Sequence, residues 1–203
     1  MMHYGAAARS AWSCDSCVME SVVCQPSLRE VVPACIEKFF LQKGIPMALK
    51  KTPLKKAQIG RCGELLVQYL LLSRGIESAP MTTDSGIDLV AYAPTNAIAM
   101  TIQVKTNLQA KPSGGKGKLG LDWWIADDNS AQIVALVDLF SKQVWLFTHN
   151  EIATLAQQHS SGRYHIFVST DPTYKPKKIN RLAHLHEFAK YSLEVRVHEL
   201  FDH

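Results

Sequence analysis

Two stretches of the sequence, residues 86–92 and 98–106, are rich in β-branched and apolar residues and are separated by one short turn. The intervening Ala-Pro-Thr-Asn-Ala segment is typical of a turn, because proline fixes φ and asparagine tolerates a left-handed backbone. The pattern predicts a β-hairpin. Successive side chains of a strand point to opposite faces, so Gln103 and Lys105 share one face of the second strand. Antiparallel pairing then brings Asp88, near the start of the first strand, beside both of them.

A helix is predicted over Gln58–Ser73, because apolar residues recur there at three- and four-residue steps and Gly75 ends the pattern. The residues expected on its apolar face are Ile59, Cys62, Leu65, Leu66, Tyr69, Leu70 and Leu72. A polar stripe beside this face is formed by Arg61, Glu64 and Gln68. Glu64 is therefore expected to point toward a site and not into the core. The alternative is an exposed glutamate paired with Arg61, which would contribute only ~0.3 kcal/mol.

This arrangement resembles the PD-(D/E)xK nuclease superfamily, the restriction-endonuclease-like proteins. Their signature is an aspartate on one strand and Glu/Asp-x-Lys on the next. Asp88 matches the first position, and Gln103-Val104-Lys105 matches the second with glutamine in place of glutamate. Predicted endonucleases and relatives of the archaeal-type Holliday junction resolvases have such a Gln-x-Lys strand. They also carry a glutamate after a glycine on the preceding helix, as Gly63-Glu64 does here. The resemblance covers residues 57–150.

The resemblance implies an α/β fold with an αβββαβ core, in which helices flank a mixed central β-sheet. It also implies a Mg²⁺- or Mn²⁺-dependent DNA endonuclease whose catalytic residues are Glu64, Asp88, Gln103 and Lys105. Of these, Asp88, Gln103 and Glu64 would hold the metal through oxygen atoms, which are the ligands that Mg²⁺ prefers. Lys105 would orient the attacking water and meet the negative charge that develops at the phosphate. A homodimer is expected, because cutting two strands needs two sites.

Glutamine at position 103 removes one negative charge from the implied metal site and should lower its metal affinity. An active nuclease of restriction, repair or junction-resolving type is still the main hypothesis, because relatives tolerate glutamine there. The alternative is a catalytically inactive nucleic-acid-binding or protein-interaction domain that retains the nuclease fold. A third interpretation is a soluble α/β protein in which Asp88 and Lys105 form a structural pair.

Positive charge is concentrated around the predicted site. Residues 51–118 contain nine Lys and Arg against four Asp and Glu, whereas residues 119–203 contain eight against ten. This distribution fits a polyanionic partner such as DNA, although a solvated lysine face gives the same excess. The candidate DNA-binding residues are Lys55, Lys56, Arg61, Lys111, Lys116 and Lys118. The last three lie in the Gly-rich segment 107–120, which is predicted to be a mobile loop.

Further strands and helices are predicted in the rest of the chain. Ile133–Asp138 and Gln143–Thr148 should form a second hairpin, and their continuous apolar character indicates central strands buried on both faces. The other expected elements are a strand at Ile76–Met81, a helix at Asn150–His159 capped by Asn150, a strand at Tyr164–Ser169, a helix at Lys177–Tyr191, and a strand or helical turn at Leu193–Leu200.

Residues 1–46 differ from the rest and are expected to be a poorly structured extension before a nuclease-like domain over residues 47–203. Four of the five cysteines lie in this extension. They make zinc binding an alternative, although their spacing is irregular: Cys14, Cys17, Cys24 and Cys35. Translation from Met47 is a further hypothesis, which the intact mass of the native protein tests. The cysteine usage and the lack of a long apolar run predict a cytoplasmic protein outside the membrane.

Overall fold

The computed structural model describes residues 53–83, 86–96, 98–115, 117–176 and 182–201. The cysteine-rich extension and its alternative zinc site therefore lie outside the described residues, as does the candidate DNA-binding residue Lys116. The boundary expected between residues 46 and 47 stays a prediction. No helix among the described residues is long and apolar enough to cross a membrane.

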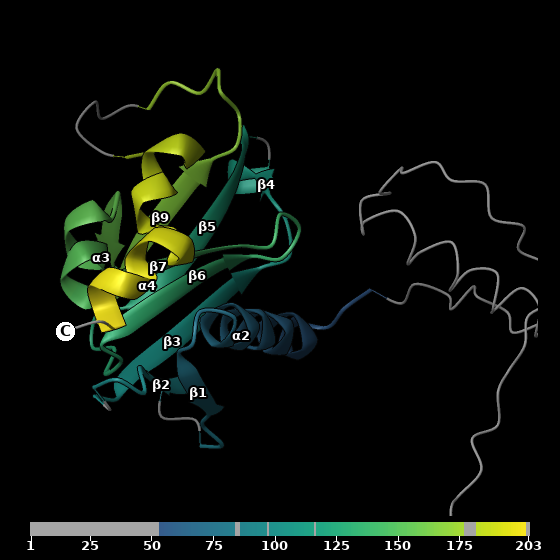
Figure 1. The fold of residues 1–203 in the computed structure, drawn as a ribbon. Helices are drawn as coiled ribbons and strands as arrows, with labels where there is room; N and C mark the ends of the chain where they lie inside the picture. Colours follow the sequence, from purple (N-terminus) through teal and green to yellow (C-terminus); the bar gives the residue numbers. More distant parts are fainter. Residues whose placement is uncertain (1–52, 84–85, 97, 116, 177–181, 202–203) are drawn as a thin grey trace, which may run out of the picture. The chain divides into compact units, whose positions relative to one another are not determined.

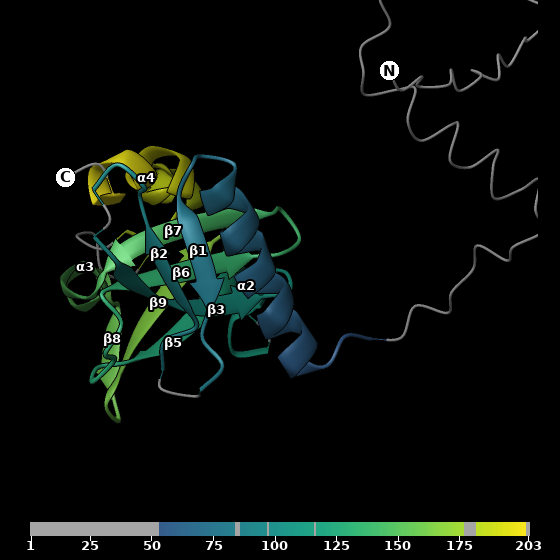
Figure 2. The same ribbon diagram turned by 60° about the horizontal axis from the view of Figure 1, so that its bottom comes forward.

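The centre of the fold is a five-stranded mixed sheet (Figures 1 and 2). Its strands lie in the order β1 (Glu77–Pro80), β2 (Leu89–Tyr92), β3 (Met100–Asn107), β6 (Ile133–Asp138) and β7 (Gln143–Thr148). Strands β3 and β6 are parallel, and the other neighbours are antiparallel. Both predicted hairpins are thus confirmed, and so is the α/β class with a mixed central sheet flanked by helices. All six residues of β6 are buried, as expected for a central strand.

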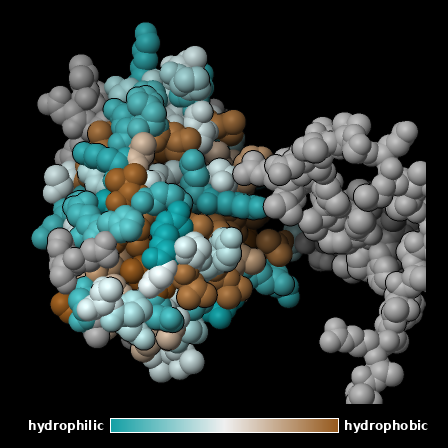
Figure 3. Space-filling view, in the orientation of Figure 1, coloured by the Kyte–Doolittle hydropathy of each residue, from teal (hydrophilic) through white to brown (hydrophobic). Residues whose placement is uncertain are grey.

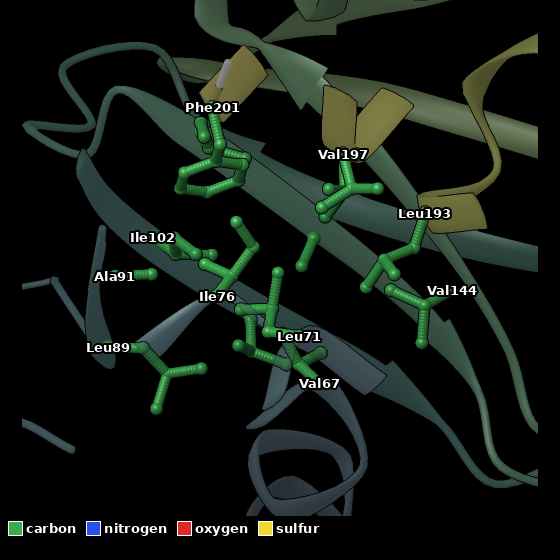
Figure 4. Close-up of a cluster of buried hydrophobic side chains, with 14 of the residues drawn as sticks. Val67, Leu71, Ile76, Leu89, Ala91, Ile102, Val144, Leu193, Val197 and Phe201 are labelled. Carbon is green, nitrogen blue, oxygen red and sulfur yellow. The ribbon is translucent and has the colours of Figure 1, made fainter. Parts of the chain in front are cut away.

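Helices α2 (Lys56–Leu72) and α4 (Leu193–Phe201) cover one face of this sheet. Figure 4 shows the core between these layers, where Val67 and Leu71 from α2 approach Leu89 and Ile102 of the hairpin. These four side chains are fully buried. The β2–β3 hairpin is therefore anchored by its apolar face, and its opposite face carries the polar residues of interest.

A second sheet covers the other face of the central sheet. Its strand order is β4 (Lys111–Pro112), β5 (Leu119–Ala126), β9 (Arg163–Ser169) and β8 (Gln158–Ser160). Helix α3 (His149–Leu155) and the 3₁₀ segment η2 (Leu185–Tyr191) complete this layer. The core between the two sheets includes Trp123, Trp145 and Phe147, which are buried, whereas Trp124 is exposed.

One connection differs from the expected αβββαβ order. The chain passes from β3 to β6 through β4, the short 3₁₀ segment η1 (Ser113–Gly115) and β5, with no α-helix among the described residues between them. Strand β5 buries alternate residues, Leu121, Trp123 and Ile125, and this period of two is typical of a strand. The segment predicted as a mobile loop is ordered where it is described, because β4 pairs with β5 and the Ser113 amide donates to the Lys118 carbonyl at 3.0 Å.

The predicted apolar face of α2 is also wrong in phase. The buried residues are Gly63, Val67 and Leu71, which repeat at four-residue steps, whereas several of the expected residues are exposed: Cys62, Leu65, Tyr69 and Leu72. Apolar residues surround this helix on most sides, so periodicity alone does not select the buried face. Figure 3 shows the resulting mixture of hydrophobic and hydrophilic residues on the surface seen in the orientation of Figure 1.

The C-terminal elements are shorter or different from those expected. Helix α3 starts at His149 because Thr148 is its cap: the Thr148 hydroxyl accepts from the Glu151 amide and the Glu151 carboxylate accepts from the Thr148 amide. Asn150 is therefore inside the helix, and residues 158–160 are strand β8. The helix expected over 177–191 is described only from residue 182, and it is a 3₁₀ segment from Leu185 to Tyr191. The last element, α4, is helical.

Candidate active site

The N-terminal half of α2 packs directly on β3 through Gly63. A Cβ built at Gly63 would overlap Thr106 Oγ1 and would lie 2.9 Å from both Cβ and Cγ2 of Thr106. Only glycine permits this approach of the helix to the strand. The contact fixes the height of α2 above β3, and it therefore also fixes the position of the next residue, Glu64.

Glu64 and Asp88 line the same small pocket, whose volume is about 240 Å³. Glu64 lies on α2, and Asp88 is the residue just before β2, so the pocket lies between the helix and the end of the hairpin. Its remaining lining residues are Met81, Thr82, Thr83 and Ile87. Two carboxylates that are 24 residues apart in sequence thus line one pocket, and their metal-binding role stays a prediction.

Asp88 is held against β3 by two hydrogen bonds. Its amide donates to the Ile102 carbonyl at 2.9 Å, and its Oδ2 accepts from the Val104 amide at 2.6 Å. The carboxylate therefore takes the place of a backbone carbonyl at the end of the ladder. This pairing fixes the orientation of the Asp88 side chain with respect to the Gln-x-Lys strand.

Gln103 lies opposite Asp88, one step beyond the last ladder pair, Leu89 with Ile102. The Gln103 side chain is buried, with 7% of the residue exposed. Its Nε2 donates to the carbonyl of Gly86 at 2.9 Å, and Gly86 adopts φ +77°, a conformation that favours glycine. Its Oε1 is buried and has no hydrogen-bond partner among the described residues. A buried acceptor without a partner costs about 1–3 kcal/mol. This oxygen is therefore suited to coordinate a cation or to accept a hydrogen bond from a bound molecule.

Lys105 is two residues farther along β3 and is partly buried. The pleat places it on the face of Gln103, and no ion pair involves it within the described part of the chain. The ion pairs of the described residues thus do not include the structural Asp88–Lys105 pair considered from the sequence. Gln103 and Lys105 align with Val134 and Leu136 of β6, which contribute to the core beneath the second sheet.

The structure therefore brings three of the four predicted residues near one another, in two separate contacts, and Lys105 follows Gln103 along β3. Glu64 meets Asp88 in the pocket, and Asp88 meets Gln103 across the hairpin. Gln103 and Lys105 are absent from the described lining of the pocket. Asp88 is the residue that links the helical side of the sheet to the face that carries Gln103 and Lys105.

Glu64 also has a cationic partner. Arg61 Nη1 lies 2.7 Å from Glu64 Oε2, and the side chains are 49% and 24% exposed respectively. This is the pair that the sequence offers as the alternative role of Glu64. At this exposure such an i, i+3 pair contributes little to stability, so it does not prevent Glu64 from changing partner.

The described lysines predicted to bind DNA have different environments. Lys55 and Lys56 are exposed at the start of α2, and Lys111 is exposed on β4. Lys118 instead forms an ion pair with Asp171 at 2.9 Å. The pKa of Asp171 is lowered to about 2, mainly because the Thr173 hydroxyl donates to it and secondly because Lys118 does. In the folded protein Lys118 thus has a carboxylate partner at the surface, as Arg61 has in Glu64, and its predicted contact with DNA stays a prediction.

The donor set matches a hard divalent cation in type, although it is small. Two carboxylates and one amide oxygen are the kind of ligands that Mg²⁺ and Mn²⁺ accept, and the remaining positions of such an ion are usually filled by water or phosphate. Among the described residues, no three His, Cys, Asp or Glu side chains are gathered as a ligand group. The partnerless Oε1 of Gln103 is the feature of the structure that fits an additional ligand.

A larger cavity, of about 640 Å³, lies between β7 and η2 and is lined in part by Trp145, His184 and His186. Its described lining includes one carboxylate, Glu194, which pairs with Arg74 at 3.2 Å. Size alone would favour this cavity as a binding site. The smaller pocket fits metal chemistry better, because two carboxylates line it.

The sequence did not identify the groups that position the site. These are the Gly86 carbonyl, the Val104 amide and the contact of Gly63 with Thr106. Nearly every residue has a backbone amide and a carbonyl, so residue identity does not show which of these groups form such contacts. Gly86 stands at the start of the predicted first strand, and its role is seen only in the fold, where it adopts φ +77° and its carbonyl accepts from Gln103.

No protein-family model matches this chain, and no curated protein matches its sequence. A solved structure of a bacterial homing endonuclease is similar in fold. The similarity covers 73% of this chain and 92% of that chain, at 15% sequence identity and a TM-score of 0.48.

Proposed function

We propose that this protein is a metal-dependent DNA endonuclease that uses Mg²⁺ or Mn²⁺ to hydrolyse phosphodiester bonds. The observation that carries the proposal is the shared pocket of Glu64 and Asp88, together with the buried, partnerless Oε1 of Gln103 opposite Asp88. The sequence resemblance to PD-(D/E)xK nucleases assigns metal-binding roles to these same three residues. Residue chemistry and position thus support the same function.

In this proposal, Glu64 and Asp88 hold the cation through carboxylate oxygens, and Gln103 supplies a neutral oxygen. The cation, when bound, supplies Lewis acidity and lowers the pKa of a bound water. The Val104 amide keeps the Asp88 carboxylate oriented through its 2.6 Å hydrogen bond. Gln103 is kept in place by its hydrogen bond to Gly86, which leaves Oε1 available.

Lys105 is proposed to orient the attacking water and to stabilise the charge that develops at the scissile phosphate. Its ammonium has no carboxylate partner among the described ion pairs. An unpaired cation next to a phosphate lowers the free energy of the transition state more than a cation that is already neutralised. Exposed Lys55 and Lys56 are proposed to contact the flanking phosphates.

The second candidate is a catalytically inactive DNA-binding or protein-interaction domain. Two observations favour it: Gln103 and Lys105 are not part of the described pocket lining, and Arg61 neutralises Glu64. A domain of this kind would bind DNA through its basic residues without needing a metal. Homodimer formation stays a prediction, and sedimentation or light scattering of the full chain tests it.

The test is cleavage of supercoiled plasmid and of branched duplex DNA in Mg²⁺ or Mn²⁺. The variants are Asp88→Asn, which retains an oxygen for the Val104 amide, and Lys105→Ala. The matched control is Asp122→Asn, which changes an exposed carboxylate on β5. We expect each site variant to slow cleavage by about 10²–10³-fold, the effect of removing one group that stabilises the transition state, and the control to cut at the parent rate.

Two outcomes would contradict the proposal in different ways. Cleavage that persists in Asp88→Asn would mean that the reaction takes place elsewhere on the protein. A parent protein that binds DNA equally well in EDTA and in Mg²⁺, and cuts none of the substrates, would favour the inactive binding domain.

A further inference from the structure

The Arg61–Glu64 pair occupies one of the two carboxylates that line the pocket. Arg61 Nη1 donates to Glu64 Oε2 at 2.7 Å, and both residues lie on α2, one helical turn apart. Glu64 is the less exposed partner, and the arginine is half exposed to solvent. The guanidinium is therefore the partner that can move away without breaking the packing of the helix on the sheet.

Among the described residues, two carboxylates line the pocket, those of Glu64 and Asp88, and one guanidinium, that of Arg61, pairs with the first of them. A divalent cation that enters the pocket is attracted by the carboxylates but repelled by the guanidinium. Binding of the cation thus competes with the Arg61–Glu64 pair for the same carboxylate.

Arg61 has a second partner within reach when DNA is present. It lies in the first turns of α2, close in sequence to Lys55 and Lys56, and all three side chains are exposed. Guanidinium groups bind phosphate with two parallel hydrogen bonds, which makes a DNA phosphate a strong competitor for Glu64. Arg61 can thus pair with Glu64 in the absence of DNA and bind a phosphate in its presence.

We propose that Arg61 exchanges partners during loading of the site: it pairs with Glu64 in the metal-free protein and with a DNA phosphate once a divalent cation occupies the pocket. This inference rests on the proposed metal-dependent function. Its consequence is that cation and DNA bind cooperatively. The cation displaces Arg61 from Glu64, and a DNA phosphate binds the displaced guanidinium. The exchange limits metal binding in the absence of substrate.

The first test is the affinity of the full-length protein for Mn²⁺ without DNA, measured by titration calorimetry. Arg61→Ala removes the competitor, so we expect it to bind Mn²⁺ about two- to fivefold more tightly, the equivalent of one weak surface ion pair. The matched control is Arg74→Ala, which breaks another surface Arg–Glu pair, to Glu194, outside this pocket. The control should bind Mn²⁺ with the parent affinity.

The second test measures how much Mn²⁺ tightens DNA binding at constant ionic strength, in a Lys105→Ala background that prevents cutting. With Arg61 present, we expect Mn²⁺ to tighten binding of a labelled duplex by a factor of about five or more, a typical coupling between two ligands. With Arg61→Ala, the factor should fall toward one. Anisotropy of the labelled duplex gives both affinities.

The outcomes separate the exchange from the underlying function. Mn²⁺ binding that is lost in Asp88→Asn but unchanged in Arg61→Ala would overturn the exchange and leave the metal site intact. A loss of DNA affinity in Arg61→Ala that is equal with and without Mn²⁺ would also overturn it, because Arg61 would then be a permanent phosphate contact. Absence of any Mn²⁺ binding that depends on Asp88 would remove the metal-dependent function and the exchange together.

Discussion

The contact between Gly63 and Thr106 allows a sharp test of how the helix positions the site. A methyl group at residue 63 would overlap Thr106 Oγ1 and would lie 2.9 Å from Cβ and Cγ2. Thr106 is β-branched and sits within a strand, so rotation of its side chain does not clear the space. Helix α2 must therefore move away from β3 in Gly63→Ala.

The magnitude follows from two opposing effects. Replacing a helical glycine by alanine stabilises the folded protein by about 1 kcal/mol through backbone entropy. Overpacking of a tight contact costs about 1–3 kcal/mol. We therefore expect Gly63→Ala to lower the free energy of unfolding by roughly 0–2 kcal/mol. Gly60→Ala is the matched control on the same helix, because nothing lies within 4 Å of a Cβ built there. It should gain about 1 kcal/mol.

The assay is urea unfolding of both variants, combined with plasmid cleavage. The two free energies of unfolding should differ by about 1–3 kcal/mol, and only Gly63→Ala should lose cleavage, because Glu64 moves with the helix. Adding Thr106→Ala should restore part of the lost stability, since the Thr106 hydroxyl has no hydrogen-bond partner among the described residues. Equal stabilisation by both alanines would refute the close packing of α2 on β3.

Three other predictions concern single groups. Gln103→Glu should lower the melting temperature in EDTA, because a carboxylate oxygen replaces the amide donor, and should increase the rise in melting temperature that Mn²⁺ produces. Lys118→Ala should raise the pKa of Asp171 from about 2, and Thr173→Val should raise it more, because the Thr173 hydroxyl is the larger cause; carboxyl chemical shifts measure both. Burial lowers the pKa of His165 below its usual 6.5, so the unfolded state takes up the proton first as pH falls, and the free energy of unfolding decreases below pH 6.5. His165→Phe should weaken this dependence of the free energy of unfolding on pH in urea unfolding, and an unchanged dependence would contradict the prediction.

Both hairpins could be predicted from the sequence, because strands with alternating or continuous apolar residues leave a clear pattern. The second sheet, which takes the strand expected at Tyr164–Ser169, could not. The buried face of α2 could not. Leucines lie on most sides of that helix, so they do not indicate which face is buried. The buried face contains Gly63, which has no side chain and therefore adds nothing to the apolar pattern. The close approach to Thr106 decides the face, and this contact joins residues far apart in the chain.

The proximity of Asp88 and Gln103 could be predicted, because hairpin register determines it. The shared pocket of Glu64 and Asp88 followed from the family resemblance and not from periodicity. The pairing of Lys118 with Asp171 could not be predicted, since 53 positions separate the two residues and only the folded second sheet brings them together. Charge counts alone therefore do not show which lysines have an ion-pair partner in the folded protein.

The alternation of faces along β3 has a consequence for how this protein can change in evolution. Ile102 and Val104 belong to the core, and Gln103 and Lys105 occupy the opposite face. Insertions in the turn between β2 and β3 leave this order intact. A single added residue inside β3 would exchange the two faces, placing the lysine on the side of α2 and the isoleucine on the side of the second sheet, so related chains should vary in turn length while the strand admits no insertion.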